Sequence, residues 1–98
     1  MSKKVWVFFL VLGFFSLSFS GCYYFSATKE MKAAEKLLAD LKAQGGEKLV
    51  PYEYCSAVQF LEDTKLEYRE GDYKSAKEFA SRSQSAAQAG LAEIQKKK

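Results

Sequence analysis

The chain has 98 residues, a formal net charge of +3 and 48% hydrophobic residues, so it has room for one small domain and not for a large catalytic architecture. It contains no histidine, which excludes Ser-His-Asp and Cys-His nucleophile systems and every imidazole-bound metal site. The apolar residues are unevenly placed, because no charged residue occurs between positions 5 and 28 whereas the later positions mix charged and apolar side chains.

The first element is a leader with the layout of a secretion signal. Lys3 and Lys4 give it a positive start, residues 5–15 form an apolar run, and residues 16–21 are smaller and more polar. The two lysines keep the N-terminus in the cytoplasm, so the chain after the leader is exported. The predicted domain organisation therefore begins with a signal peptide at residues 1–21.

The leader ends in the sequence Phe-Ser-Gly-Cys at residues 19–22, which resembles the lipobox of bacterial lipoproteins. The family usually has leucine where Phe19 stands. The resemblance implies cleavage between Gly21 and Cys22 and attachment of lipid to the Cys22 thiol and the new amine. It also associates an aspartate after the cysteine with the inner membrane. Because Tyr23 stands there, the resemblance favours the periplasmic face of the outer membrane.

The alternative for the same segment is an uncleaved membrane helix. Residues 6–25 are 20 residues long, which matches a hydrocarbon core of about 30 Å, and aromatic residues lie at both ends. Either interpretation makes the protein a membrane-anchored one. The aromatic residues 23–25 either settle into the lipid headgroup layer or simply end the anchor.

A short linker at residues 22–26 precedes the first predicted helix, over residues 27–44. Ser26 is its expected N-cap, and the Gly45-Gly46 pair is its expected end. Apolar residues recur every three or four positions, which is the period of an amphipathic helix. They are Ala27, Met31, Ala34, Leu38 and Leu41.

Two further helices are predicted, over residues 51–70 and 73–95. Pro51 suits the first turn of a helix, Gly71 suits a left-handed stop, and Asp72 is the expected N-cap of the last helix. The apolar face of the second helix comprises Tyr54, Ala57, Val58, Leu61, Thr64 and Tyr68. That of the third comprises Tyr73, Ala76, Ala80, Ser83, Ala87, Leu91 and Ile94.

The short break at Gly71-Asp72 makes the last two helices an antiparallel hairpin. The predicted fold class is all-α, a small antiparallel three-helix bundle over residues 27–95 that follows a lipoprotein signal peptide. Whether the first helix packs on the hairpin or stands apart as a stalk stays open, since residues 45–50 connect them. Residues 96–98 are a basic tail.

The exported residues resemble the bacterial domain of unknown function 4398 over approximately residues 27–94. The features that carry the resemblance are a proline-aromatic start to the second helix, a Gly-x-Tyr turn and regularly spaced alanines. Here these are Pro51, Tyr54, Ala57, Leu61, Gly71, Tyr73, Ala76, Ala80 and Ala87. The resemblance implies an envelope lipoprotein and carries no catalytic residue.

The second helix contains an unpaired cysteine and an acidic run. Once Cys22 is acylated, Cys55 is the remaining thiol; burial in the domain is the favoured interpretation, and a free thiol or an intermolecular disulfide is the alternative. The acidic run is expected to be a solvated helix face, not a metal site. It comprises Glu62, Asp63, Glu67, Glu70 and Asp72.

The chain ends in Lys96, Lys97 and Lys98. Such a tail can be a solvated helix end, a contact with anionic envelope polymer, or a covalent attachment point. A lipid at one end and a lysine at the other resemble the family of Braun's lipoprotein, whose C-terminal lysine is joined to peptidoglycan. The glycines and Pro51 interrupt the continuous helix of that family, so a solvated tail is the favoured interpretation.

Together these patterns predict a non-enzymatic structural or interaction lipoprotein, without cofactor or metal, whose partner is an envelope protein or a second copy of the chain. A peptidoglycan tether acting through the terminal lysines is the second hypothesis, and an inner-membrane accessory subunit with an uncleaved helix is the third. Outside the leader and the terminal lysines the charge is slightly negative, which argues against nucleic-acid binding.

Overall fold

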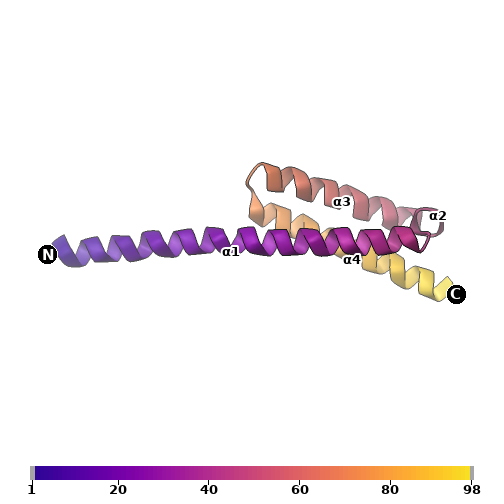
Figure 1. The fold of residues 1–98 in the computed structure, drawn as a ribbon, viewed down its shortest axis with the longest axis horizontal. Coiled ribbons are helices and arrows are strands. Elements are labelled where there is room, and N and C mark those ends of the chain that lie inside the picture. Colours follow the sequence, from indigo (N-terminus) through magenta and orange to yellow (C-terminus); the bar gives the residue numbers. More distant parts are fainter. Residues whose placement is uncertain (1, 98) are drawn as a thin grey trace.

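The protein is described by a computed structural model, which gives the backbone of residues 2–97 and the side chains of residues 3–10 and 23–97. Within that part of the chain the secondary structure is entirely helical, as expected. The helices are α1 (Ser2–Ala43), α2 (Gly46–Leu49), α3 (Pro51–Arg69) and α4 (Tyr73–Lys97). Figure 1 shows α3 and α4 lying along the second half of α1, while its first half projects beyond them.

Helix α1 differs from the prediction at its start. It begins at Ser2 and not after Ser26, so it is continuous through residues 22–26, where a linker was expected. Ser26 therefore lies inside a helix and is not an N-cap. The physical reason is that residues 2–26 contain no proline. An isolated glycine such as Gly21 lowers helix stability by only about 1 kcal/mol relative to alanine, so it does not end the helix.

The break after α1 is at the predicted glycine pair. Gly45 has a φ of 82°, the left-handed conformation that ends a helix, and Gly46 opens the single turn of α2. A Cβ atom on Gly46 would lie 2.5 Å from Leu41 Cγ and 2.8 Å from the Leu41 carbonyl oxygen. This glycine is therefore required by close approach, and it lets the chain reverse tightly over the end of α1.

The hairpin between α3 and α4 also forms where the sequence predicts it. Helix α3 begins at Pro51 and ends at Arg69, and Gly71 follows with a φ of 83°. The Asp72 carboxylate accepts hydrogen bonds from the Ser75 backbone N–H at 3.1 Å and from the Ser75 hydroxyl at 3.0 Å, so it caps α4 as expected.

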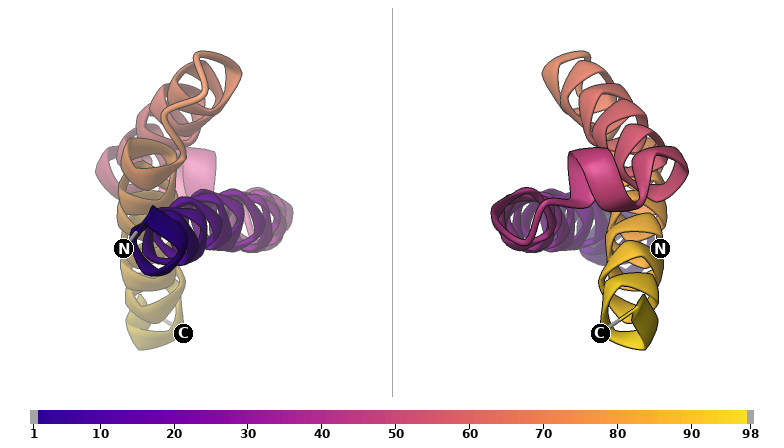
Figure 2. Two further views of the ribbon diagram at one scale, coloured as in Figure 1. Left: turned by 90° about the vertical axis from the view of Figure 1, so that its left-hand side faces the viewer. Right: turned by 90° about the vertical axis from the view of Figure 1, so that its right-hand side faces the viewer.

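Helix α4 packs against both α1 and α3, while α1 and α3 touch each other less. The end-on views show α4 crossing α1 on its way from the hairpin turn to the C-terminal end (Figure 2). The residues that α4 buries recur every three or four positions, and all but the last are small, which allows neighbouring helices to approach closely. They are Ala76, Ala80, Ser83, Ala87, Gly90 and Ile94.

Of the predicted face, the five residues from Ala76 to Ile94 other than Leu91 are buried, Tyr73 and Leu91 are half-buried, and the buried residue at the last-but-one turn is Gly90. A Cβ atom on Gly90 would lie 3.1 Å from Leu41 Cδ1 and 3.2 Å from Glu53 Cβ. The gap left by the missing side chain is therefore filled by Leu41 of α1, a contact that helical periodicity alone does not reveal.

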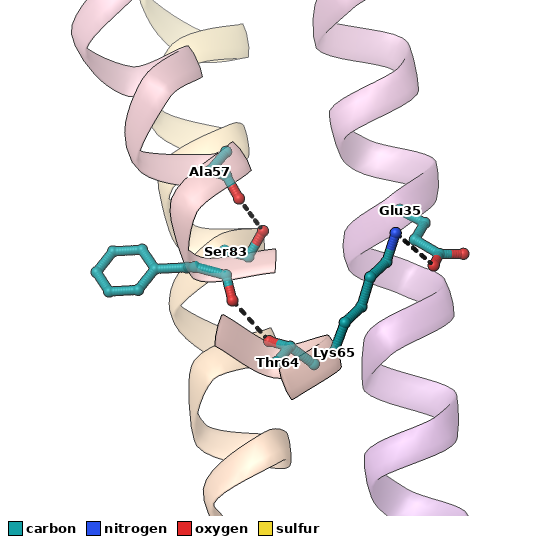
Figure 3. A network of polar contacts seen from close by, with 6 residues as sticks. Glu35, Ala57, Thr64, Lys65 and Ser83 are labelled. Atoms are coloured by element: carbon teal, nitrogen blue, oxygen red, sulfur yellow. Dashed lines mark hydrogen bonds and ion pairs between the residues drawn. The ribbon is translucent and has the colours of Figure 1, made fainter. Parts of the chain in front are cut away.

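Two buried hydroxyl groups lie within this interior. The Ser83 hydroxyl of α4 donates to the Ala57 carbonyl oxygen of α3 at 2.7 Å, and the Thr64 hydroxyl donates back to the Phe60 carbonyl at 2.8 Å (Figure 3). Both groups are fully buried and both are satisfied.

The largest buried apolar side chains gather at the end of the domain where α2 and the C-terminal turns of α4 meet. Leu41, Val50 and Ile94 form this cluster with two buried alanines. The opposite end, beside the Gly71-Asp72 turn, holds tyrosines. The molecule is an elongated body with extents of 71 × 23 × 15 Å. Among the residues whose side chains are described, 3–10 and 23–97, no helical stretch is long and apolar enough to cross a membrane.

Candidate functional site

The predicted lipidation site lies within α1. The backbone is helical at Gly21 and Cys22, and their side chains are outside the described residues. Among the residues before them, positions 5–10 are apolar, and each is at least half exposed. Such a continuous exposed apolar surface is unusual for a protein in water and indicates a segment that belongs in an apolar environment.

Just beyond Cys22, three tyrosines from three helices meet. Tyr24 of α1 packs edge-on against Tyr73 of α4, with ring centroids 5.1 Å apart, and lies 5.8 Å from Tyr68 of α3. Tyr68 and Tyr73 are themselves 5.3 Å apart in a T-shaped arrangement. We call these three residues the tyrosine cluster; it joins the middle of α1 to both helices of the hairpin.

Polar contacts complete the tyrosine cluster. The Thr28 hydroxyl donates to the Tyr24 carbonyl oxygen at 2.9 Å, and its oxygen lies 2.9 Å from the Tyr68 hydroxyl. The hydrogen bond with Tyr68 raises the pKa of the Tyr24 hydroxyl above the ordinary 10.0, and the Tyr68 charge and burial act in the same direction. Hydrogen bonds with Thr28 and Tyr24 lower the pKa of Tyr68. The Tyr24 phenol is therefore neutral at physiological pH, and packing is its role here.

Sequence reasoning missed the tyrosine cluster. Tyr68 and Tyr73 were placed on the apolar faces of their helices, but Tyr24 was assigned to the anchor. A signal was present, because Tyr24 precedes Ala27 by three positions and so continues the buried face of α1 toward the leader.

On the side of the hairpin away from α1, α3 and α4 enclose an open groove of about 460 Å³. We call it the outer groove; its lining is mostly small or aromatic. The Phe60 and Phe79 rings stack at 6.4 Å beside it, and the Arg82 guanidinium lies 5.6 Å from the centre of the Phe79 ring. The groove is lined by Tyr52, Glu53, Ser56, Phe60, Ser81, Arg82, Ser85, Ala86 and Ala89.

Lys96 and Lys97 lie at the end of α4 opposite the tyrosine cluster. The Lys97 ammonium donates to the Leu49 carbonyl oxygen at 2.8 Å, which ties the end of α4 to the end of α2. Lys96 forms a loose pair with Glu93, with N and O atoms 4.0 Å apart and the lysine 77% exposed, so this pair contributes little. Lys98 lies outside the described residues.

The structure corrects the interpretation of Cys55. Its side chain is exposed and unpaired among the described residues, so the favoured prediction of burial is wrong. The physical reason is that Ala57, two positions later, is the residue that faces the other helices, which turns Cys55 outward. A free thiol or an intermolecular disulfide stays a prediction.

The acidic run lies around the end of α3, and one of its members is perturbed. Partial burial and the neighbouring carboxylates of Glu70, Asp72 and Asp63 raise the pKa of the Glu67 carboxyl above its ordinary 4.5. Among the described residues, no group of three or more histidine, cysteine or acidic side chains is arranged to hold a metal ion. The acidic run is thus a crowded, partly solvated surface.

Comparison with known proteins returns no family model, no curated protein and no solved structure that matches the chain. The functional hypotheses therefore rest on the residues and their geometry.

Proposed function

We propose that this protein is a non-enzymatic lipoprotein of the bacterial cell envelope. Lipid on Cys22 holds it at the periplasmic face of the outer membrane, and it presents a helical face to an envelope protein or to a second copy of itself. Residues 1–21 are the signal peptide, residues 27–95 are an antiparallel three-helix bundle, and residues 96–98 are a basic tail. The resemblance to the domain of unknown function 4398 is part of this proposal.

One observation carries the proposal: the helix that contains Cys22 is the helix that packs into the domain. Ala27, five positions later, is already fully buried, and no irregular segment intervenes. Lipid at Cys22 would therefore hold the domain directly at the bilayer and not through a flexible tether. The exposed apolar side chains of residues 5–10 support the same proposal, because the apolar run of a signal peptide enters the membrane, where exposed apolar side chains are favourable.

The anchor would be firm. Each acyl methylene buried in the bilayer contributes about 0.8 kcal/mol; one chain gives only marginal binding, whereas the lipidation implied by the lipobox supplies more than one chain. The domain would then stay at the membrane without any apolar span of its own in the exported residues.

The intact mass of the protein extracted from membranes tests this proposal, with wild type beside Cys22→Ser. We expect residues 22–98 plus acyl groups for the wild type and loss of that species in the variant. Ser20→Ala serves as a control, because it leaves the cysteine in place. An unmodified full-length mass in the wild type would contradict the proposal.

A second candidate is a peptidoglycan tether acting through the terminal lysines. It is favoured by the position of Lys97 at the end of α4 that lies away from Cys22. The 25 residues of α4 correspond to about 37 Å of helix, measured from the Gly71-Asp72 turn. Sacculi purified in hot detergent and then digested test it. Retention of the wild type and release of a chain ending at Gln95 would establish the tether, and release of both would exclude covalent linkage.

The third candidate, an inner-membrane subunit with an uncleaved helix, is favoured by the continuity of α1 across Gly21 and Cys22, since a peptidase needs an extended segment at the cut. The mass measurement described above separates it from the lipoprotein. A full-length mass at the inner membrane is its expected result.

The outer groove is the face that we propose for the protein partner, because two aromatic residues and several small residues line it. A photoreactive residue at Ser85, inside the outer groove, should cross-link in cells to an envelope protein or a second copy. The same residue at the exposed Lys36 of α1 is the matched control. Equal cross-linking at both positions would argue against a specific face.

A further inference from the structure

Three consecutive aromatic side chains are exposed at the end of the domain nearest Cys22. Tyr23 and Tyr24 are about two-fifths exposed, and Phe25 is 74% exposed. Among the described residues, the Phe25 ring makes an edge-on contact with the Tyr24 ring, with the two ring centroids 5.6 Å apart. A phenylalanine left this open beside a membrane anchor indicates an apolar surface that is covered by something outside the domain.

The hairpin turn belongs to the same surface, although it is about fifty positions away in the chain. Tyr23 lines a shallow hollow of about 360 Å³ together with Gly71, Asp72, Tyr73 and Lys74. Figure 1 shows the α3–α4 turn at the level where the first half of α1 emerges from the domain. We call Tyr23, Phe25 and these four turn residues the anchor-side surface.

The anchor-side surface is held in place relative to Cys22. Tyr24 lies two residues beyond the cysteine, which is about 3 Å along the helix. Its ring packs against those of Tyr68 and Tyr73 at centroid distances of 5.8 and 5.1 Å. Because these contacts join α1 to the last turn of α3 and the first turn of α4, the turn cannot swing away from the acylated residue without breaking the tyrosine cluster.

We infer that the anchor-side surface rests in the lipid headgroup layer, so that the domain stands on the membrane in one orientation with its terminal lysines pointing away. The inference rests on the proposed lipidation of Cys22. Tyrosine rings with a polar tip favour the boundary between hydrocarbon and water, and a lysine such as Lys74 can lay its apolar stem along that boundary and keep its charge in water.

Lipid is the occupant that the geometry favours, because acyl chains at Cys22 bring the bilayer to within one helical turn of Tyr23 and Phe25. The charge of the surface does not oppose contact with a lipid headgroup layer. The turn carries both the acidic Asp72 and the basic Lys74, so the surface has no strong field of either sign.

A tryptophan reporter tests the inference. The single tryptophan of the chain, Trp6, lies in the predicted signal peptide, so the mature lipoprotein contains none. Lys74→Trp and Lys96→Trp replace two exposed lysines at opposite ends of α4, and Phe25→Trp marks the anchor. Each lipidated protein is placed in phosphatidylethanolamine–phosphatidylglycerol vesicles that contain lipid with a quencher near the headgroup.

We expect quenching of Lys74→Trp to be several-fold stronger than that of Lys96→Trp and close to that of Phe25→Trp. Equal, weak quenching at both lysine positions would overturn the inference. So would protection of Lys74→Trp that increases with the protein-to-lipid ratio, because a second copy would then cover the surface. Helical circular dichroism of all three variants confirms folding.

The failure of the proposed function has a different signature. If the leader is not removed, the wild-type protein keeps Trp6 and fluoresces, and its mass is that of the full chain. If the wild-type protein is acylated and shows no tryptophan emission but the two lysine variants are quenched equally, the lipoprotein proposal is supported and the inferred orientation is wrong.

Discussion

Ser83 illustrates how one polar atom can join two helices in a core made of small residues. Its hydroxyl is completely buried and donates to the Ala57 carbonyl oxygen across the α3–α4 interface at 2.7 Å. An alanine fits the space, but it removes the single side-chain hydrogen bond that is drawn between these helices in Figure 3. A hydrogen bond of this kind contributes about 0.5–1.5 kcal/mol to stability.

We therefore predict that Ser83→Ala lowers the free energy of unfolding by about 1 kcal/mol relative to Ser85→Ala. Ser85 is exposed on the same helix, so both variants have the same gain in helix propensity and the difference isolates the hydrogen bond. Urea unfolding followed by circular dichroism measures it. Equal stabilities of the two variants would mean that the bond contributes nothing.

Glu67 is the residue at which pH should act on stability. Partial burial, followed by the repulsion of Glu70, Asp72 and Asp63, raises the pKa of its carboxyl in the folded state above 4.5. Ionisation therefore works against folding: this penalty is complete above the raised pKa and disappears as the pH falls below 4.5.

Glu67→Gln should accordingly raise the melting temperature near neutral pH, and its advantage over wild type should vanish in acid, at about pH 3. Glu62→Gln, an exposed carboxylate on the same helix, is the control. Melting curves across this range provide the measurement. A gain that persists unchanged in acid would point to a cause other than ionisation.

At the scale of the element, Leu41 determines how α1 joins the rest of the domain. Its side chain is fully buried and fills the spaces above Gly46 and Gly90. These contacts link α1 to α2 and to α4 at one point. The Leu41 side chain thus occupies the space that the absent side chains of Gly46 and Gly90 leave free. This packing offsets the loss of helix stability that a glycine causes within α4.

Leu41→Ala should cost about 3 kcal/mol, because it leaves a cavity that is bordered by backbone at both glycines and cannot easily collapse. Leu66→Ala, at a leucine that is 49% exposed on α3, should stay within about 0.5 kcal/mol of wild type. Thermal and urea unfolding compare the two. Similar losses in both would show that α1 is not held by this contact.

At the scale of the whole molecule, the two cysteines are expected to differ in the reactivity of their thiols. Cys22 lies in α1, two positions before Tyr24 of the tyrosine cluster, and Cys55 lies exposed on α3. If Cys22 carries lipid, its thiol is blocked, whereas nothing in the described part of the chain covers Cys55.

We predict that a water-soluble maleimide labels the folded, membrane-extracted protein once per chain and that Cys55→Ser abolishes the label. Two labels per chain would show a free Cys22 and contradict the lipoprotein. A non-reducing gel of the unlabelled protein tests the intermolecular disulfide, since a dimer that depends on Cys55 should disappear on reduction.

Helical periodicity and break residues were sufficient to predict the all-α class, the glycine stops at positions 45 and 71, the cap at Asp72 and most buried positions of α3 and α4. These features are local, because a repeat of three or four residues and a left-handed glycine act within a few positions. The lipobox-like cysteine is likewise visible in the sequence, and its lipidation stays a prediction.

Only the tertiary structure decided which helices meet and which side chains lie close to Cys22 in space. Periodicity places Ala57, Ser83 and Gly90 on buried faces, but their partners depend on the angle and register at which α1, α3 and α4 pack. The same long-range packing brought the Tyr24 ring against those of Tyr68 and Tyr73. Residues more than forty positions apart interact only after the chain has folded, and no local pattern in the sequence encodes their distance.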